Sequence, residues 1–106
     1  MSNQQESQTK KESVAQVVEQ QLKDGSLGKT LTDIAFVANR HNLRLSRQTL
    51  HNWYHQTYLP SNSILRLFIY DLQAEQGQDW NSEAETLLSF FQKIWEAAGY
   101  DQKRPQ

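Results

Sequence analysis

The sequence predicts a compact all-α domain built from five helices. Apolar residues recur at helical spacing in five separate segments of the chain. Three of these segments begin after a Ser or Thr that is followed three residues later by Gln, Asp or Glu, the spacing of a helix capping box. No Asn-Gly or Asp-Gly pair joins two alternating apolar runs, as a β-hairpin would require. Helices are therefore expected throughout.

Length and composition favour one small domain. The chain has 106 residues, of which 37% are hydrophobic, enough for a single core but not for a deep cleft between two lobes. It contains no cysteine, which excludes disulfides, thiolate metal sites and cysteine nucleophiles. The first residues carry two lysines with no apolar run behind them, so we expect neither a signal peptide nor a membrane contact. A soluble, cytoplasmic protein is the expectation.

The first two helices follow a polar arm. Residues 1–12 lack any helical or strand period and are expected to be disordered. Ser13 and Gln16 mark the start of a helix that ends at Gly25, where glycine supplies a left-handed stop. Thr30 and Asp33 mark the start of the second helix, which is expected to end where Asn42 takes the left-handed conformation.

The third helix, from about Ser46 to His55, has two faces of different chemistry. Ser46 is its expected cap, and Thr49, Leu50 and Trp53 share one face. Trp53 is interpreted as a core anchor because of those neighbours. The opposite face carries only polar side chains: Arg47, Gln48, His51, Asn52 and His55.

The fourth and fifth helices complete the domain. Pro60 and Ser61 mark the start of the fourth, which is too apolar for a surface position and is predicted to be central to the core. A loop through Gly77 follows. Ser82 and Glu85 then predict a capping box for a long amphipathic helix that ends at Gly99. The expected units are a core at 13–76, a C-terminal helix at 77–99 and a flexible tail at 100–106.

Charge is segregated along the chain, although the net charge is only −1. Residues 29–66 hold five basic residues and one acidic residue, a net charge of +4, whereas residues 67–106 hold three basic and seven acidic residues, a net charge of −4. Affinity for nucleic acid depends on Lys and Arg near phosphates. The basic segment contains the third helix, so a nucleic-acid contact is expected there.

Two helices joined by a turn of a few residues can place the second helix in the major groove of DNA. The second helix then has an apolar inner face and a polar outer face. Arg can donate twice to guanine, and Asn or Gln can pair twice with adenine. The residues expected to face bases are Arg47, Gln48, His51 and Asn52. The expected partner is therefore double-stranded DNA, with the bound protein in the nucleoid.

From about Thr30 to Leu72 the chain resembles the lambda-repressor-like, XRE-type helix-turn-helix family. The resemblance rests on LTDIAFVANRHNL, on SRQTLHNW, and on YHQTYLPSNSILRLFIYDL, in which an aromatic residue, a loop, a proline and an apolar helix follow one another. It differs in its turn, which is about two residues longer than the common form. The resemblance implies the same fold and phosphate contacts from Lys29, Thr30, Thr32, Arg44, Tyr58, Ser61 and Asn62. Helix N-termini attract phosphates, which supports Thr30 and Ser61 independently.

Proteins that read DNA with this fold usually pair, so a homodimer is expected. The last helix carries large apolar side chains beyond those needed for its own packing, and such a surplus suggests a partner. The expected interface consists of Leu87, Phe90, Phe91, Ile94 and Trp95. This helix or the termini also offer a possible contact to another protein.

Three alternatives stay open. The polar stripe of the third helix is also typical of a solvated helix face. His51 and His55 have the spacing of a shared metal site but no obvious third ligand, so no metal or cofactor is expected. No phosphate loop, nucleophile elbow or carboxylate cluster is present, and an enzyme is not expected. We therefore predict a sequence-specific transcriptional regulator of the repressor type, with an antitoxin, a mobile-element accessory protein or a non-DNA-binding adaptor as alternatives.

Overall fold

The computed structural model describes residues 13–75 and 82–100 of the chain. The described part is all-helical, with no strand, which confirms the predicted fold class. Its five helices are α2 (Val14–Asp24), α3 (Leu31–Arg40), α4 (Arg47–Tyr54), α5 (Asn62–Glu75) and α6 (Ser82–Ala97). The predicted arm at 1–12, the loop through Gly77 and the tail beyond Tyr100 lie outside the described residues.

The helix α2 has both of its predicted end signals. The Ser13 hydroxyl accepts a hydrogen bond from the Gln16 amide at 3.1 Å, and the Ser13 amide donates to Gln16 Oε1 at 2.8 Å. These two bonds satisfy amides that the first helical turn leaves unpaired. Gly25 ends the helix with a φ of 77°. The capping box and the glycine stop are thus confirmed.

The start of α3 is a second capping box. The Thr30 hydroxyl accepts from the Asp33 amide at 3.1 Å, while the Asp33 carboxylate accepts from the amides of Thr30 at 3.2 Å and Lys29 at 3.1 Å. A negative carboxylate at this end also suits the helix dipole. Gly28 makes the close approach possible: a β-carbon there would lie 2.2 Å from Asp33 Cβ.

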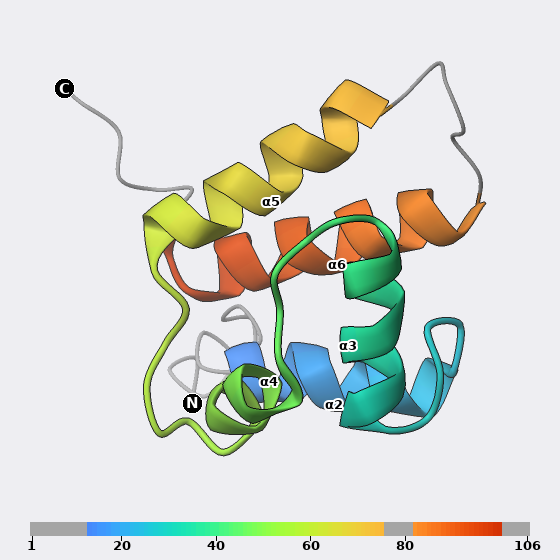
Figure 1. The fold of residues 1–106 in the computed structure, drawn as a ribbon. Coiled ribbons are helices and arrows are strands. Elements are labelled where there is room, and N and C mark those ends of the chain that lie inside the picture. Colours follow the sequence, from blue (N-terminus) through green and yellow to red (C-terminus); the bar gives the residue numbers. More distant parts are fainter. Residues whose placement is uncertain (1–12, 76–81, 101–106) are drawn as a thin grey trace, which may run out of the picture.

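Residues 41–46 connect α3 to α4 by a segment that runs back along α3 (Figure 1). Asn42 reverses the chain with a φ of 68°, the left-handed conformation predicted for it. The Leu43 amide then donates to Ala38 O at 3.0 Å. The return of the chain brings the start of α4 beside α3, and these two helices pack together.

Asn39 holds this returning segment in place. Its Nδ2 donates to Ala35 O at 2.7 Å within α3 and to Leu45 O at 2.8 Å in the segment. One side chain therefore ties the segment to the helix beside which it runs. Leu43 and Leu45 are buried, and Arg44 between them is exposed.

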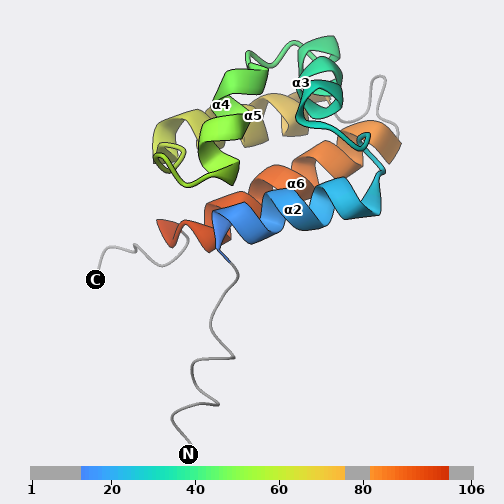
Figure 2. The ribbon, with the colours of Figure 1, turned by 90° about the horizontal axis from the view of Figure 1, so that it is seen from below.

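The helices form two layers around a common core. In Figure 2, α2 and α6 lie side by side in one layer, with α3 and α4 above them. The helix α6 also packs along α5, so it has neighbours on two sides. The buried apolar side chains of all five helices form one cluster, and the largest of them are Trp53, Phe68, Phe90 and Phe91. The interpretation of Trp53 as a core anchor is confirmed.

The position of α5 differs from the prediction that it would be central to the core. Ser61 caps it as predicted, because its hydroxyl accepts from the Ile64 amide at 3.1 Å. Leu65, Phe68 and Leu72 are buried, but Leu67 is 50% exposed and Tyr70 is 68% exposed. The central helix is α6, which α2 and α5 both contact. Because α5 packs chiefly on α6, only one of its faces is covered by other residues of the segments 13–75 and 82–100.

The helix α6 begins at Ser82 itself, one residue earlier than a cap at Ser82 implies. Beyond its end, Gly99 takes a φ of 87°, as expected for a left-handed stop. Tyr100, which the sequence assigned to the flexible tail, instead donates its hydroxyl to Pro60 O at 2.8 Å. Over residues 13–75 and 82–100, none of the helices combines the length and apolar character needed to cross a membrane.

Candidate nucleic-acid interface

The helix α4 is held by its apolar face, which fixes the direction of the polar one. Leu50 is fully buried and Trp53 nearly so. The Ser46 hydroxyl accepts from the Thr49 amide at 3.1 Å and thereby caps the first turn. Arg47 and Gln48 lie exposed on the opposite side. The helix is short, and the predicted limits Ser46 and His55 are its two capping residues.

A chain of hydrogen bonds runs along the outer face of α4. Gln48 Nε2 donates to Asn52 Oδ1 at 3.3 Å, and Asn52 Nδ2 donates to the Tyr58 hydroxyl at 2.7 Å. An amide group has two N–H donors and two acceptor lone pairs, so each of these amides keeps capacity for a ligand. These two hydrogen bonds restrict the side-chain rotamers of Gln48 and Asn52. They also link Tyr58, in the following loop, to α4.

His51 contributes less to this face than the sequence suggests. Its Nδ1 is buried and has no hydrogen-bond partner among the described residues, so this atom is closed to a ligand. Its ring lies 4.2 Å from the His55 ring, centroid to centroid. No group of three or more potential metal ligands occurs in the described part of the chain. His51 is therefore mainly a packing residue of α4 with one edge toward solvent.

The basic residues near α4 differ in whether an acidic side chain pairs with their positive charge. Arg40 donates to the carboxylate of Glu83 on α6 and also lies 5.1 Å from the ring centroid of Phe36. Arg44 and Arg47 are exposed, and neither forms an ion pair with another described residue. The positive charge of residues 29–66 is thus partly neutralised, and Arg44 and Arg47 supply what remains next to α4.

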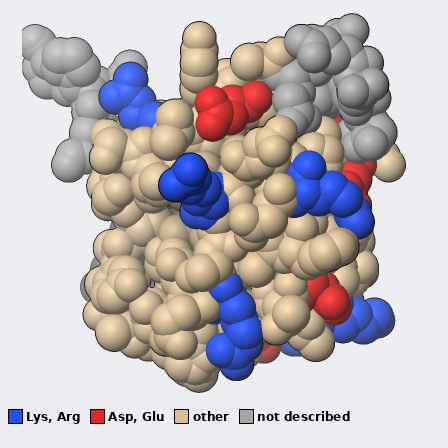
Figure 3. All heavy atoms as spheres, viewed as in Figure 1, with Lys and Arg blue, Asp and Glu red and all other residues tan. Residues whose placement is uncertain are grey.

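The face of the molecule on which α4 is seen in Figure 1 is mostly uncharged. Figure 3 shows Lys and Arg side chains spaced over this face and separated by uncharged surface, rather than merged into one basic patch. Phosphate neutralisation would therefore offer a limited share of the free energy if a nucleic acid bound here. Any specific contact would depend on hydrogen-bonding groups such as those of Gln48 and Asn52.

The start of α3 is less open to phosphate than the sequence suggests. The Asp33 carboxylate already occupies the amides of Lys29 and Thr30 and would repel a phosphate there. The Lys29 side chain turns back toward Gly25, where a β-carbon would lie 3.2 Å from its Cε. Its ammonium group thus lies near the C-terminal end of α2, a favourable place for a cation. Thr32 is exposed on the first turn of α3.

The residues predicted to bind phosphate at and before the start of α5 differ in exposure and in hydrogen-bond partners. Ser61 is exposed, although its hydroxyl caps the helix. Asn62 is half-buried, and its Oδ1 accepts from Trp95 Nε1 at 2.8 Å. This bond ties α5 to α6 and gives Asn62 a structural role. Tyr58 is 53% exposed and lies at the end of the hydrogen-bond chain from α4.

The residues predicted for a dimer interface on α6 are packed inside the chain's own core. Leu87, Phe90, Phe91 and Ile94 are each at most 1% exposed, and Trp95 is half-buried. The first four cover the surfaces of α2 and α5, so these four side chains are not open to a second molecule. The large apolar side chains that are exposed lie elsewhere among the described residues: at Phe36 on α3, at Tyr58 and Leu59 in the loop after α4, and at Leu67 and Tyr70 on α5.

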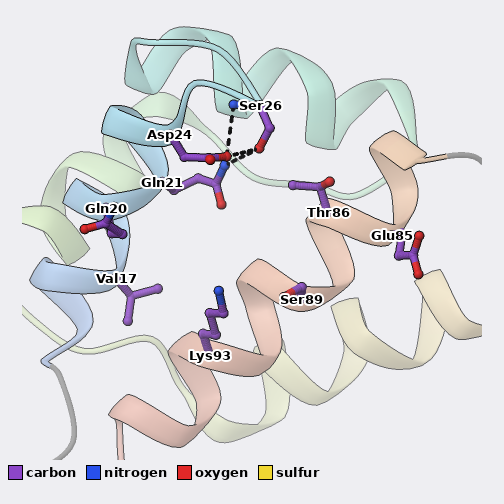
Figure 4. Close-up of a pocket in the computed structure, with 9 residues that line it drawn as sticks. All are labelled: Val17, Gln20, Gln21, Asp24, Ser26, Glu85, Thr86, Ser89 and Lys93. Carbon is purple, nitrogen blue, oxygen red and sulfur yellow. Dashed lines mark hydrogen bonds between the residues drawn. The ribbon is translucent and has the colours of Figure 1, made fainter.

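A polar groove of about 760 Å³ lies between α2 and α6 (Figure 4). Asp24 at one end is bound by Ser26, and these hydrogen bonds, helped by the nearby Lys93 ammonium, lower the pKa of its carboxyl group. Gln20, Gln21 and Ser89 supply further polar walls. The Asp24 carboxylate is thus used to fix the turn after α2, and the groove lies apart from the polar face of α4.

No protein-family model, curated protein or solved structure matches the chain. The structure itself therefore defines the class of the protein: its described residues form an all-α domain of five helices with a polar face on α4.

Proposed function

We propose that the protein binds double-stranded DNA and regulates transcription, with α4 in the major groove. The observation that carries this proposal is the outer face of α4, where Arg47, Gln48 and Asn52 are presented without any acidic side chain on the same helix. Arg suits guanine, and Gln or Asn suits adenine, through paired hydrogen bonds to base edges. The resemblance to XRE-type helix-turn-helix domains agrees with this reading.

The packing of α4 supports the proposal further. Specific base contacts need side chains whose positions are set before DNA arrives, because each ordered rotamer otherwise costs binding free energy. The bonds from Gln48 to Asn52 and from Asn52 to Tyr58 restrict these side chains in advance. Arg44 and Arg47 are available for phosphates or bases beside them. We assign Thr30 and Asn62 no direct role, because their side chains have partners within the chain, and none to Lys29, because its side chain turns back toward the end of α2.

The decisive experiment begins with selection of duplexes from a random-sequence pool. Fluorescence anisotropy on an enriched duplex and an unrelated one, at about 50 and about 200 mM salt, then separates specific from non-specific binding. Arg47→Ala and Gln48→Ala should each weaken binding to the enriched duplex by about 1–3 kcal/mol, the usual value of a good base contact. Lys93→Ala removes a cation from the α2–α6 groove instead, and it should leave that affinity nearly unchanged.

Two results would overturn the proposal: failure to enrich any duplex together with no binding at low salt, or equal losses in Arg47→Ala and Lys93→Ala. The second candidate function would then be that of an adaptor that binds other proteins. One observation favours it, namely the exposed apolar side chains Leu67 and Tyr70 on α5. Substitutions on α4 should not affect an adaptor that works through α5.

A further inference from the structure

The outward face of α5 has the residue spacing of a helix-pairing seam. Ser63, Leu67, Tyr70 and Ala74 are all exposed and recur at intervals of four, three and four residues. We call these four residues the α5 seam. They lie on the side of α5 opposite the buried residues Leu65, Phe68 and Leu72, which pack in the core. Intervals of three and four place the seam on one stripe of the helix, as in a two-stranded coiled coil.

Two opposite charges flank the seam on its two sides. Arg66 precedes Leu67, and Asp71 follows Tyr70. Both are exposed, and neither forms an ion pair with another described residue. In heptad terms, Ser63 and Tyr70 take d positions, Leu67 and Ala74 take a positions, Arg66 takes a g position and Asp71 the next e position. The chain therefore carries complementary flanking charges five residues apart.

We propose that the α5 seam pairs with the seam of a second copy of this chain, with the two helices parallel. Leu67 and Tyr70 would each meet their own counterparts across a twofold axis. Arg66 would lie beside Asp71 of the partner subunit, because g and the following e position face each other between parallel helices. Because the dimer has twofold symmetry, it contains this ion pair twice. Three of the four seam residues, Ser63, Leu67 and Tyr70, line a groove of about 610 Å³ whose wall on α6 includes Gln92 and Trp95.

The parallel arrangement follows from the charges and from the position of α4. Between antiparallel helices each flank meets the same flank of the partner, so Arg66 would not reach Asp71 of the partner subunit. The helix α4 lies toward the end of the molecule at which α5 begins (Figures 1 and 2). Parallel pairing places both α4 helices at the same end of the dimer, where one duplex can contact both. Antiparallel pairing would place them at opposite ends.

The expected dimer is weak. Stable interfaces bury about 1,200–2,000 Å² in total, and the exposed face of one helix of 14 residues offers less than that. We expect a dissociation constant in the micromolar range, so that free protein is largely monomeric when dilute. The pairing does not depend on DNA, and its test is carried out without DNA, so its failure is separate from failure of the proposed function.

Cysteine cross-linking tests the pairing and its direction, because the chain has no cysteine of its own. In a parallel dimer, Ser63→Cys alone and Ala74→Cys alone should each form a disulfide-linked dimer under mild oxidation. In an antiparallel dimer these positions would be 11 residues apart, about 16 Å along the helix, and only a mixture of the two variants would cross-link. Self-linking of each variant is the expected result, and cross-linking only in the mixture would overturn the proposal.

Sedimentation of the cysteine-free protein, from about 1 to about 500 μM, gives the second test. The average mass should rise toward that of a dimer, and Leu67→Ser with Tyr70→Ser should abolish the rise. Phe36→Ser is the matched control, because Phe36 is 64% exposed but lies on α3. Arg66→Asp should weaken pairing, and adding Asp71→Arg should restore it. A monomer at every concentration, or equal loss in the control, would overturn the proposal.

Discussion

Asn52 donates a hydrogen bond to the hydroxyl group of Tyr58 at 2.7 Å, and this bond joins the outer face of α4 to the loop that follows it. Asn52 is half-buried, whereas Tyr58 is exposed. The amide of Asn52 thus has a fixed orientation before any ligand binds. A residue of the loop, outside α4, sets the geometry of a candidate base contact.

Tyr58→Phe should therefore weaken DNA binding without changing the fold. The substitution removes only the hydroxyl group, and a neutral hydrogen bond contributes about 0.5–1.5 kcal/mol, so the dissociation constant should rise about two- to tenfold. Anisotropy on the enriched duplex measures this change. Tyr70→Phe, on α5, removes a hydroxyl group for which the described residues show no partner, and it should have no comparable effect. Equal effects of the two substitutions would contradict the role assigned to Tyr58.

Glu83→Gln should lower stability in a pH-dependent way. Hydrogen bonds from Arg40 hold the pKa of the Glu83 carboxyl group below its ordinary value of 4.5, and a hydrogen bond from His41 acts in the same direction. A lowered folded-state pKa stabilises the protein above the unfolded-state value, and that stabilisation is lost as the pH falls through the folded-state pKa.

The cost of Glu83→Gln should be about 1 kcal/mol at neutral pH and should shrink as the pH falls below 4.5. Urea denaturation at a series of pH values measures it. Glu85→Gln, on the same helix, is the control, because Glu85 forms no ion pair with another described residue. If Glu83→Gln lowers the free energy of unfolding equally at all pH values down to 3, the role assigned to the contacts from Arg40 and His41 to the Glu83 carboxylate is wrong.

Gly28→Ala should destabilise the protein more than Gly99→Ala. Both glycines have positive φ values, 108° and 87°, so both substitutions introduce backbone strain of about 1 kcal/mol or more. At Gly28 the new methyl group would also collide with Asp33 and disturb the cap of α3, whereas at Gly99 nothing lies within 4 Å. Thermal unfolding followed by circular dichroism compares the two. Equal losses would show that the contact between Gly28 and Asp33 is relaxed in solution.

Asn39→Asp should cost more stability than Asn39→Ala. Alanine removes the two hydrogen bonds to Ala35 O and Leu45 O, at about 1–2 kcal/mol. Aspartate additionally places a negative oxygen against the same two carbonyl oxygens, which repel it. Protonation restores a donor, so the difference between the two variants should narrow at low pH. Chemical denaturation at about pH 7 and about pH 4 provides the measurement, and a more stable Asn39→Asp variant would argue against these bonds.

Local signals predicted most of the helix ends. The pairs Ser13 with Gln16 and Thr30 with Asp33 act through neighbours three residues away, so they are readable without knowledge of the tertiary structure. The inner face of α4 was also predictable, because Leu50 and Trp53 are surrounded by polar residues that leave only one apolar side. Such patterns depend on one helix alone.

The exposed and buried sides of α5 and α6 were not predictable in the same way. Residues 64–72 are apolar at seven positions, so periodicity alone does not decide which of Leu65 and Leu67 lies inside. That choice depends on how many neighbours each helix has, and α6 has two where α5 has mainly one. The partners of Asn39, Tyr58 and Asn62 depend likewise on contacts between segments, which no local spacing reveals.

The segment from Leu43 to Ser46 is a place where the insertion or deletion of a single residue would disturb the fold. Its side chains alternate between inside and outside, with Leu43 and Leu45 buried and Arg44 and Ser46 exposed. In an extended chain, loss or gain of a single residue exchanges the two sides, and would turn a charged arginine toward the core. Insertions or deletions in homologous chains should therefore be rare here, and those that survive should come in pairs, even though the segment belongs to no helix.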